Sequence, residues 1–403
     1  MQRSTRLENA LRSVRFAPES QIMRGMRRMD LRRFLLIPIL TAFLIALSVA
    51  TWAPGSTQPT LPPKPAPAPE RWRGLIGEYG PDDDVIIVFE RDGKLVALLK
   101  HTEVEILEEV DENTFKFPSP GPHAQQHLTF ERDATGRATQ LAIDAIVAEA
   151  RPRGPQPGSP DGVGRSGRAQ SDYKRRNIEP ESGNQLHVTP LRPVADLMKE
   201  ALAAQPPNET GDFREGDLVE LTKLDPTIRL EVRYATTNNF LGTKFYSQAR
   251  AFMQRPAAEA VARANQKLKE YGYGLLIHDA YRPWYVTKVF WDATPEDKHI
   301  FVADPAKGSR HNRGCAVDLT LYDLKTKKPI EMVSTYDETT ARAYPDYPGG
   351  TSLQRWHRKL LRDVMESEGF TVYEAEWWHF DYKDWQKYRI GNVRFEGIQN
   401  RER

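Results

Sequence analysis

Cysteine is nearly absent from this sequence, because Cys315 is the only one among 403 residues. A single thiol excludes an intramolecular disulfide framework and a cysteine-rich zinc or iron-sulfur site. We expect Cys315 to pack as a small buried residue. Any metal ion must therefore be held by histidine and carboxylate side chains.

An excess of charge of one sign is also missing, since 57 basic residues face 55 acidic ones and the net charge is +2. Such a chain has no overall field that would attract nucleic acid, and we expect no nucleic-acid partner. The hydrophobic share of 39% is enough for packed cores, and 403 residues exceed the usual size of one core. The sequence therefore predicts two or more domains.

Long uncharged runs are rare, and the clearest one extends from Phe34 to Trp52 after an arginine-rich N-terminus. Its 19 residues reach the length of a bilayer span, which favours an uncleaved anchor in segment 34–53. The small residues up to Ala50 leave a cleaved signal peptide open. In both cases the positive-inside rule predicts that residues 1–33 are cytoplasmic. The remainder would be exported, either anchored in the membrane and facing the periplasm or cell wall, or periplasmic or secreted.

Composition divides the exported part into segments. Residues 54–70 are rich in proline and predict a stalk. Residues 71–150 contain short apolar runs separated by turn signals such as RDGK, which predict a small all-β accessory domain. The stretch LTFERDATGRATQLAI within it is similar to the small β-rich domain appended to some exported hydrolases. Residues 151–184, rich in glycine, proline and arginine, predict a linker.

Residues 185–403 mix helical and strand patterns, which predicts an α+β domain. The apolar spacing predicts strands at 228–235, 273–280, 316–324 and 374–382, and helices at 194–203, 256–272, 285–293 and 352–369.

Two short motifs in this domain carry the residue types of a catalytic metal site. In SRHNRGCAVD, His311 offers a nitrogen ligand and Asp318 an oxygen ligand, and in EWWH, His379 offers a second nitrogen. Three protein ligands with one open position are typical of catalytic zinc. Glu376, three residues before His379, can act as the general base that takes a proton from the attacking water.

The spacing of these motifs leaves the geometry open. Trp377 and Trp378 favour a strand, on which Glu376 and His379 would point to opposite faces unless a bulge intervenes. Each motif alone also occurs by chance. Arg282 in DAYRP adds a permanently cationic guanidinium that can stabilise an oxyanion.

The full set of motifs, in order, resembles the VanX-type D-alanyl-D-alanine dipeptidases over residues 216–398. The matching stretches are VRYATTNNFLG, YGYGLLIHDAYRP, GSRHNRGCAVDLTLYDL, PIEMVSTYD, LLRDVMESEGF and EWWHF. The resemblance implies a zinc D,D-peptidase-like fold with an antiparallel central sheet and flanking helices. It also implies one Zn²⁺ ion on His311, Asp318 and His379.

The resemblance further implies roles for other side chains. Glu376 would be the catalytic base and Arg282 the stabiliser of the transition state. Tyr234, Ser309 and Asp337 would lie around the substrate. A carboxylate at Asp337 could bind the free ammonium of a dipeptide, which a longer peptide lacks at that point.

These features predict a zinc enzyme that hydrolyses D-Ala-D-Ala or a similar D-amino-acid dipeptide outside the cytoplasm, in turnover of wall peptides and in possible contact with peptidoglycan. One alternative is a D,D- or L,D-carboxypeptidase that trims peptidoglycan stem peptides. Another is a non-catalytic module that binds the wall and keeps zinc as structural support. Glu376 and Arg282 argue against the last alternative, because binding alone needs neither residue.

Overall fold

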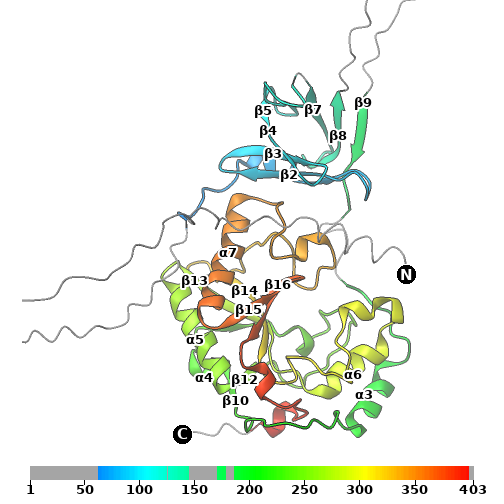
Figure 1. Ribbon diagram of the computed structural model, residues 1–403, viewed down its shortest axis with the longest axis vertical. Helices are drawn as coiled ribbons and strands as arrows, with labels where there is room; N and C mark the ends of the chain where they lie inside the picture. The colour runs from blue at the N-terminus through cyan, green and yellow to red at the C-terminus, as the bar shows by residue number, and fades with distance from the viewer. Residues whose placement is uncertain (1–61, 125, 145–169, 178–185, 399–403) are drawn as a thin grey trace, which may run out of the picture. The chain divides into compact units, whose positions relative to one another are not determined.

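Two kinds of architecture follow one another along the described part of the chain. The computed structural model describes residues 62–124, 126–144, 170–177 and 186–398 (Figure 1). Strands dominate up to residue 177, and helices alternate with strands after residue 186. The α+β class predicted for the second region is confirmed.

The first region consists of two antiparallel sheets with a shared apolar core. A short helix, α2 (Glu70–Arg73), precedes them. The first sheet contains β1 (Gly77–Tyr79), β2 (Ile86–Arg91), β3 (Lys94–Leu99) and β4 (Glu103–Ile106). The second contains β5 (Glu108–Glu109), β6 (Thr114–Lys116), β7 (His127–Arg132), β8 (Ala138–Asp144) and β9 (Gln170–Lys174). We call residues 70–175 the β region.

Strand β9 lies inside the range 151–184 that the sequence predicts as a linker. It pairs antiparallel with β8, from Gln140 opposite Lys174 to Asp144 opposite Gln170. The ladder of backbone hydrogen bonds to β8 accounts for this strand, although its sequence, QSDYK, has little apolar content. Composition therefore could not reveal it.

The last residues of the predicted stalk 54–70 contact the second region. Lys64 Nζ donates a hydrogen bond to the Tyr273 hydroxyl at 2.6 Å, and Trp356 Nε1 donates one to the Pro62 carbonyl at 2.9 Å. Ala68 is buried. The segment therefore contacts folded chain at Pro62, Lys64 and Ala68, although most of residues 62–67 are exposed.

A five-stranded sheet lies at the centre of the α+β region, in the order β11-β13-β14-β16-β15. The strands are β11 (Arg229–Leu230), β13 (Tyr273–Asp279), β14 (Ala316–Asp323), β15 (Phe370–Tyr373) and β16 (Glu376–Tyr382). Neighbours are antiparallel except β11 and β13, which are parallel. A separate two-stranded sheet pairs β10 (Leu218–Glu220) with β12 (Phe252–Gln254).

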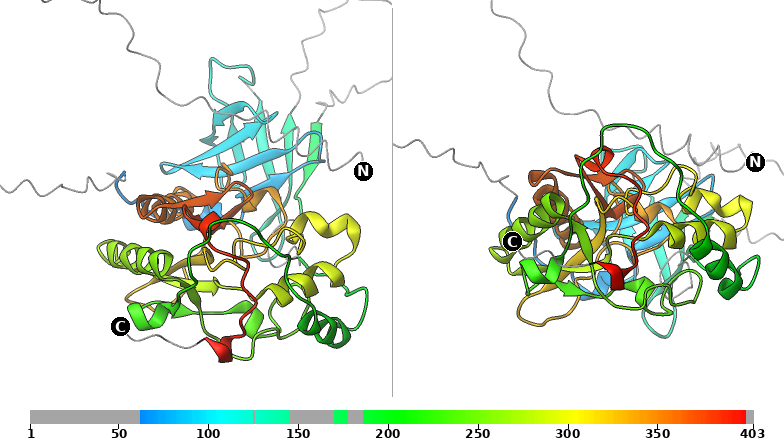
Figure 2. Two further views of the ribbon diagram at one scale, coloured as in Figure 1. Left: turned by 60° about the horizontal axis from the view of Figure 1, so that its bottom comes forward. Right: turned by 90° about the horizontal axis from the view of Figure 1, so that it is seen from below.

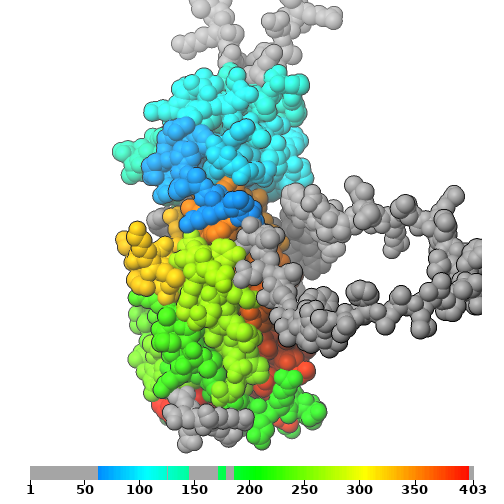
Figure 3. Space-filling view, turned by 90° about the vertical axis from the view of Figure 1, so that its left-hand side faces the viewer, coloured from blue at the N-terminus to red at the C-terminus, as the bar shows by residue number. Residues whose placement is uncertain are grey.

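Helices α5 (Arg255–Lys269) and α7 (Ser352–Ser367) pack on each other and on the central sheet. Their apolar residues recur at helical spacing and are buried in one core with the strands. The other side of α5, yellow-green in Figure 3, is on the surface. A capping box of Thr351 and Gln354 begins α7.

A second core forms where α3 (Val194–Ala203) lies beside α6 (Trp284–Ala293), seen in Figures 1 and 2. The short helix α4 (Leu221–Leu224) packs on α5. Strand 228–235 is the least accurate of the sequence expectations, because only β11 is extended and η2 (Arg233–Ala235) is a 3-10 turn. The turn places Tyr234 in the second core among other aromatic rings.

Within the described residues, no helix has the length and apolar content that crossing a membrane requires. The segment 34–53, predicted as an anchor or signal peptide, lies outside those residues.

Candidate active site

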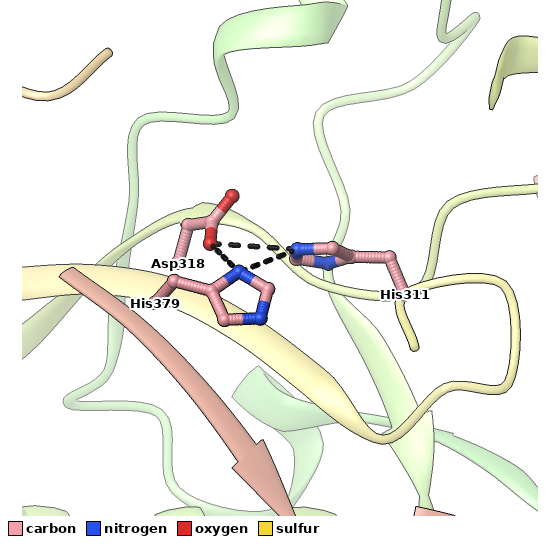
Figure 4. Close-up of side chains that lie close together, drawn as sticks. All are labelled: His311, Asp318 and His379. Carbon is pink, nitrogen blue, oxygen red and sulfur yellow. Dashed lines mark hydrogen bonds and ion pairs between the residues drawn. The ribbon is translucent and has the colours of Figure 1, made fainter. Parts of the chain in front are cut away.

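Three side chains from separate parts of the α+β region meet in one cluster (Figure 4). His379 Nδ1 is 2.9 Å from Asp318 Oδ1, and His311 Nε2 is 3.2 Å from His379 Nδ1 and 3.4 Å from Asp318 Oδ1. Zinc held tetrahedrally at about 2.0–2.2 Å separates its ligand atoms by about 3.3 Å. Two imidazole nitrogens and a carboxylate oxygen at these distances fit a zinc ion.

The central sheet places two of these residues side by side. Asp318 on β14 and His379 on β16 are register partners, so their side chains lie next to each other on one face of the sheet. His311 comes from the turn before β14. In that turn Gly314 has φ 65°, and a Cβ there would lie 2.7 Å from Leu218 Cδ2. Glycine therefore permits the tight turn that brings His311 back over the strand.

Hydrogen bonds orient both imidazole rings. His311 Nδ1 lies 2.7 Å from the Ala280 carbonyl oxygen and donates to it, which leaves Nε2 free to bind a metal. His379 Nε2 lies 3.0 Å from Asp381 Oδ1, so that Nδ1 faces the cluster. Arg310 binds the other oxygen of Asp381. Asp381 is thus a positioning residue for His379.

The carboxylates of Asp318 and Asp381 give the surroundings of His379 a negative charge that favours a cation. Burial favours the neutral ring, but hydrogen bonds to Asp318 and Asp381 outweigh it and raise the pKa of His379 to about 10. A ring that binds a metal through Nδ1 must lose its proton there, so metal binding releases a proton. Metal affinity should consequently fall as the pH is lowered.

Glu376 lies at the start of β16 and beside the cluster, with its Oε2 3.8 Å from His379 Nδ1. The pairing of β15 with β16 shifts register here, from Val372 opposite Phe380 to Tyr373 opposite Glu376. This irregularity is the bulge that lets residues i and i+3 of a strand point to the same place. Partial burial and the charge of Asp318 raise the pKa of Glu376 above its ordinary value. The side chain is 36% exposed, so its carboxylate still has access to solvent. The carboxylate can therefore accept a proton and reach solvent.

Arg282 lies three residues after the end of β13 and is almost completely buried. Both Nε and Nη2 donate to Asp279 Oδ2, at 2.9 and 2.8 Å, and the guanidinium carbon lies 5.1 Å from the Tyr234 ring centre. Burial opposes the charge, but Asp279 raises the pKa of Arg282 well above its usual value. The backbone N–H of Arg282 also donates to the His311 carbonyl at 3.1 Å, which connects the backbone of Arg282 to that of a candidate metal ligand.

The three residues expected around the substrate differ in their surroundings. Tyr234 is buried in an aromatic cluster with Phe290, whose ring centre is 4.8 Å away. Ser309 Oγ accepts a hydrogen bond from the His311 backbone N–H at 3.2 Å, so it helps to shape the turn that carries this ligand. Tyr234 contacts Arg282, and Ser309 contacts His311, so both lie close to the cluster.

The Asp337 carboxylate has no hydrogen-bond or ion-pair partner among the residues that the structure describes. The backbone of Asp337 is in the left-handed region with φ 61°. Burial and the charges of Asp318 and Glu376 raise the pKa of Asp337 well above its ordinary value. Together with Arg233 and Tyr336, it lines a small pocket of about 80 Å³. The Arg233 guanidinium in the same pocket, together with Arg282, acts against this rise in the pKa of Asp337.

Sequence reasoning missed several supporting residues. Tyr336 donates to Asp318 Oδ2 at 3.0 Å and so connects the loop of Asp337 to the cluster. Signals existed for two others, because Asp279 precedes Arg282 by three residues and Asp381 follows His379 by two. Residues i and i+2 of a strand share a face, which could have identified Asp381. No local signal identifies Tyr336, because its partner is 18 residues away.

Comparisons with known proteins find relatives of the α+β region. The family described as D-ala-D-ala dipeptidase matches residues 214–395. The D-alanyl-D-alanine dipeptidase of Escherichia coli is 34% identical over 165 residues, which cover 41% of this chain and 84% of that protein. Those of Enterococcus faecium and Streptomyces coelicolor are 33% and 32% identical, with 39% and 42% of this chain and 87% and 93% of those proteins covered.

A solved structure of an LD-carboxypeptidase, reported to reveal peptidoglycan recognition, is 20% identical and covers 47% of this chain and 77% of its own. Its TM-score is 0.27. The sequence relatives, by contrast, are covered over most of their length. This chain belongs to the family of VanX-type D-alanyl-D-alanine dipeptidases and is a metallopeptidase of the dipeptidase type.

Proposed function

We propose that this enzyme uses zinc to hydrolyse D-Ala-D-Ala or a similar D-amino-acid dipeptide outside the cytoplasm, in turnover of wall-derived peptides. The observation that supports the substrate class is the carboxylate of Asp337 beside the metal cluster, which has no hydrogen-bond or ion-pair partner among the described residues. A free ammonium is its natural partner, and a dipeptide carries one next to the scissile bond. A longer peptide has an amide nitrogen there and would leave Asp337 without a partner.

The residues divide the chemistry between them. When bound, zinc supplies a Lewis acid that polarises the scissile carbonyl and makes water more acidic. Glu376 takes the proton of the attacking water and passes it to the leaving amine, which a carboxylate with a raised pKa does well at neutral pH. Arg282, whose guanidinium is hydrogen-bonded to Asp279, stabilises the developing oxyanion through its positive charge. Asp337 orients the substrate through its ammonium.

The proposed location rests on sequence alone. The uncharged segment Phe34–Trp52 after a basic N-terminus supports export of the rest of the chain and contact with the membrane. An enzyme outside the cytoplasm would meet dipeptides released from the wall and not the cytosolic precursor pool. A phosphatase reporter fused after residue 398 should be active only outside the cytoplasm, and a cytoplasmic reporter would overturn the export proposal.

The catalytic proposal is tested by D-alanine release from D-Ala-D-Ala by the full-length chain, with zinc content measured in parallel. We expect Glu376→Gln to keep zinc and to lower the rate by about 10³-fold, in the range of general-base catalysis. The matched control is Glu374→Gln, an exposed glutamate two residues earlier, which should match the unmodified chain. Zinc in the unmodified protein without D-alanine release would contradict the dipeptidase proposal. Release of D-alanine from pentapeptide stems instead would favour the carboxypeptidase alternative.

A further inference from the structure

Strands β2 and β3 are buried on both faces, which is unusual for an antiparallel pair. One face belongs to the core of the β region, with Ile86, Val88, Leu95, Ala97 and Leu99. The opposite face, which we call the outer face, is also apolar and contains Val85, Ile87, Phe89, Val96 and Leu98. An outer face of this kind requires an apolar partner from another part of the chain.

The partner comes from the α+β region. Val333 and Tyr347 are buried in one apolar cluster with the outer face, and Ala341 packs against it. All three belong to the segment 332–351 between β14 and α7, which we call the specificity loop because it carries Asp337. The β region and this loop lie within one compact unit, Pro59–Arg403.

Buried polar contacts hold the two parts together beside the apolar cluster. Glu90, at the end of β2 and 1% exposed, accepts a hydrogen bond from the Ser352 backbone N–H at 2.7 Å through Oε2. Ser352 is the first residue of α7, so a carboxylate from the β region occupies the N-terminus of this helix. The other oxygen of Glu90 accepts from the Gly93 N–H at 2.7 Å. Arg355 Nη2 donates to the Glu90 carbonyl at 2.6 Å.

A second polar contact lies at β1. Glu78 is buried, and its Oε1 accepts a hydrogen bond from the Tyr347 hydroxyl at 2.8 Å. Tyr347 therefore contacts the β region through its ring and through its hydroxyl.

The specificity loop is also tied to the active site. The Tyr336 hydroxyl donates to Asp318 Oδ2 at 3.0 Å, and Trp377 Nε1, next to Glu376, donates to Ser334 Oγ at 2.8 Å. The left-handed backbone of Asp337 follows directly after Tyr336. The loop thus has the metal cluster on one side and the β region on the other.

We infer that the β region is a positioning element of the substrate site, in which Glu90, Tyr347 and the outer face hold the specificity loop in the conformation that presents Asp337 to the substrate ammonium. The inference rests on the proposed function for the role of Asp337. It gives the β region a part in substrate binding, and Glu90 and Tyr347 are positioning residues that touch no substrate atom.

The test is Glu90→Gln in the full-length chain. Glutamine keeps the size of the side chain but offers one acceptor oxygen, so one of the two buried N–H groups loses its partner. We expect the KM for D-Ala-D-Ala to rise about tenfold, as for a lost hydrogen bond to a charged group, while kcat per bound zinc stays within about twofold. Amide hydrogen exchange should become faster in 332–351 and stay unchanged in β14 and β16.

Two further variants make the result decisive. Glu131→Gln changes an exposed glutamate on β7 in the same way and should have no effect. Tyr347→Phe removes only the hydroxyl that contacts Glu78, and it should shift KM and exchange in the same direction by a smaller factor. It serves as the test if Glu90→Gln fails to fold.

The outcomes separate this inference from the proposed function. Unchanged KM and unchanged exchange in both variants would overturn the inference while D-Ala-D-Ala hydrolysis stands. A loss of kcat and zinc without any change in KM would also overturn it, since that pattern indicates general structural damage. Hydrogen exchange needs no substrate, so faster exchange in the loop alone would support the contact even if the enzyme did not cleave D-Ala-D-Ala.

Discussion

Asp318 and Asp337 are two carboxylates of one site whose surroundings act in opposite directions. Burial alone would raise the pKa of Asp318, but the charges and hydrogen bonds of His311 and His379 hold it well below its usual range. The pKa of Asp337 is raised well above that range by burial and by the charges of Asp318 and Glu376. Groups whose pKa values are pushed apart in this way take different roles.

The backbone around the two residues differs as well. Asp318 lies in the middle of the central sheet, opposite His379, where its position is set by strand pairing. Asp337 lies in a loop, in a left-handed conformation, and its support comes from residues outside the sheet. Strand pairing thus sets the positions of Asp318 and His379, two of the three candidate metal ligands, whereas contacts between regions support the loop that carries Asp337, the proposed partner of the substrate.

The largest expected effect is that of Asp318→Asn, which tests whether Asp318 binds the metal ion. The amide removes the negative charge that binds the cation, so we expect zinc to be lost and hydrolysis to fall by on the order of 10³-fold or more. Zinc content and D-alanine release measure this. Asp323→Asn, at the end of the same strand, should leave both unchanged, and zinc retained in Asp318→Asn would remove Asp318 from the ligand set.

Asp337→Asn tests whether Asp337 binds the substrate ammonium, and its effect on activity should be smaller. Asparagine tolerates a left-handed backbone, so the loop should persist. Loss of a charged hydrogen bond predicts a fall in kcat/KM of about 10- to 100-fold, mainly through KM, with zinc content unchanged. An equal loss of kcat at saturating D-Ala-D-Ala would contradict a role in binding the ammonium.

The same variant gives a pH test. Only the ionised form of Asp337 attracts an ammonium, and its raised pKa means that it becomes protonated at a higher pH than an ordinary aspartate. In the unmodified enzyme KM should therefore rise as the pH falls through a value above 3.8. This rise should be missing in Asp337→Asn, and an identical acid limb in both proteins would assign it to another group.

Asp381→Asn distinguishes a ligand from its support. Loss of the carboxylate behind His379 should lower zinc affinity by about 10- to 100-fold, as is typical of outer partners of metal-binding histidines. Activity should return at saturating zinc, in contrast to Asp318→Asn. Competition with a chelator measures the affinity, and activity that stays low at high zinc would indicate a direct catalytic role.

The smallest effect on activity is expected for Asp225→Asn, a carboxylate with a lowered pKa that lies outside the site. Burial opposes its charge, but hydrogen bonds from Thr227 and Asn265 lower its pKa to about 2. Relative to the ordinary value this shift contributes about 2 kcal/mol to the free energy of unfolding at neutral pH. The contribution is complete above about pH 4 and is lost as the pH falls through about 2. Urea unfolding should show a difference between the two proteins that shrinks in this window, with kcat unaffected.

Local sequence patterns predicted the helices and the types of ligand residue. The spacing around Val194–Ala203 and Trp284–Ala293 marks helices where α3 and α6 occur, since amphipathic periodicity is a local property. Motif order brought His311, Asp318 and His379 into one prediction, and the structure brings their ligand atoms together.

Nonlocal features could not be predicted. The register shift that turns Glu376 toward His379 depends on pairing with β15, and the sequence left its orientation open. The apolar run in β2 indicated a strand but not the partner of its second face, because a continuous apolar run does not identify what covers it. Strand β9 depends on hydrogen bonds to β8, which composition does not record.

The outer face of β2 and β3 has a practical consequence for anyone who expresses this enzyme in pieces. A fragment that starts at residue 185 would expose Val333 and Tyr347 to water, and the separated β region would expose Phe89 and its neighbours. Exposed apolar patches of this kind promote self-association. Such fragments should aggregate more readily than a chain that keeps the β region and the α+β region together.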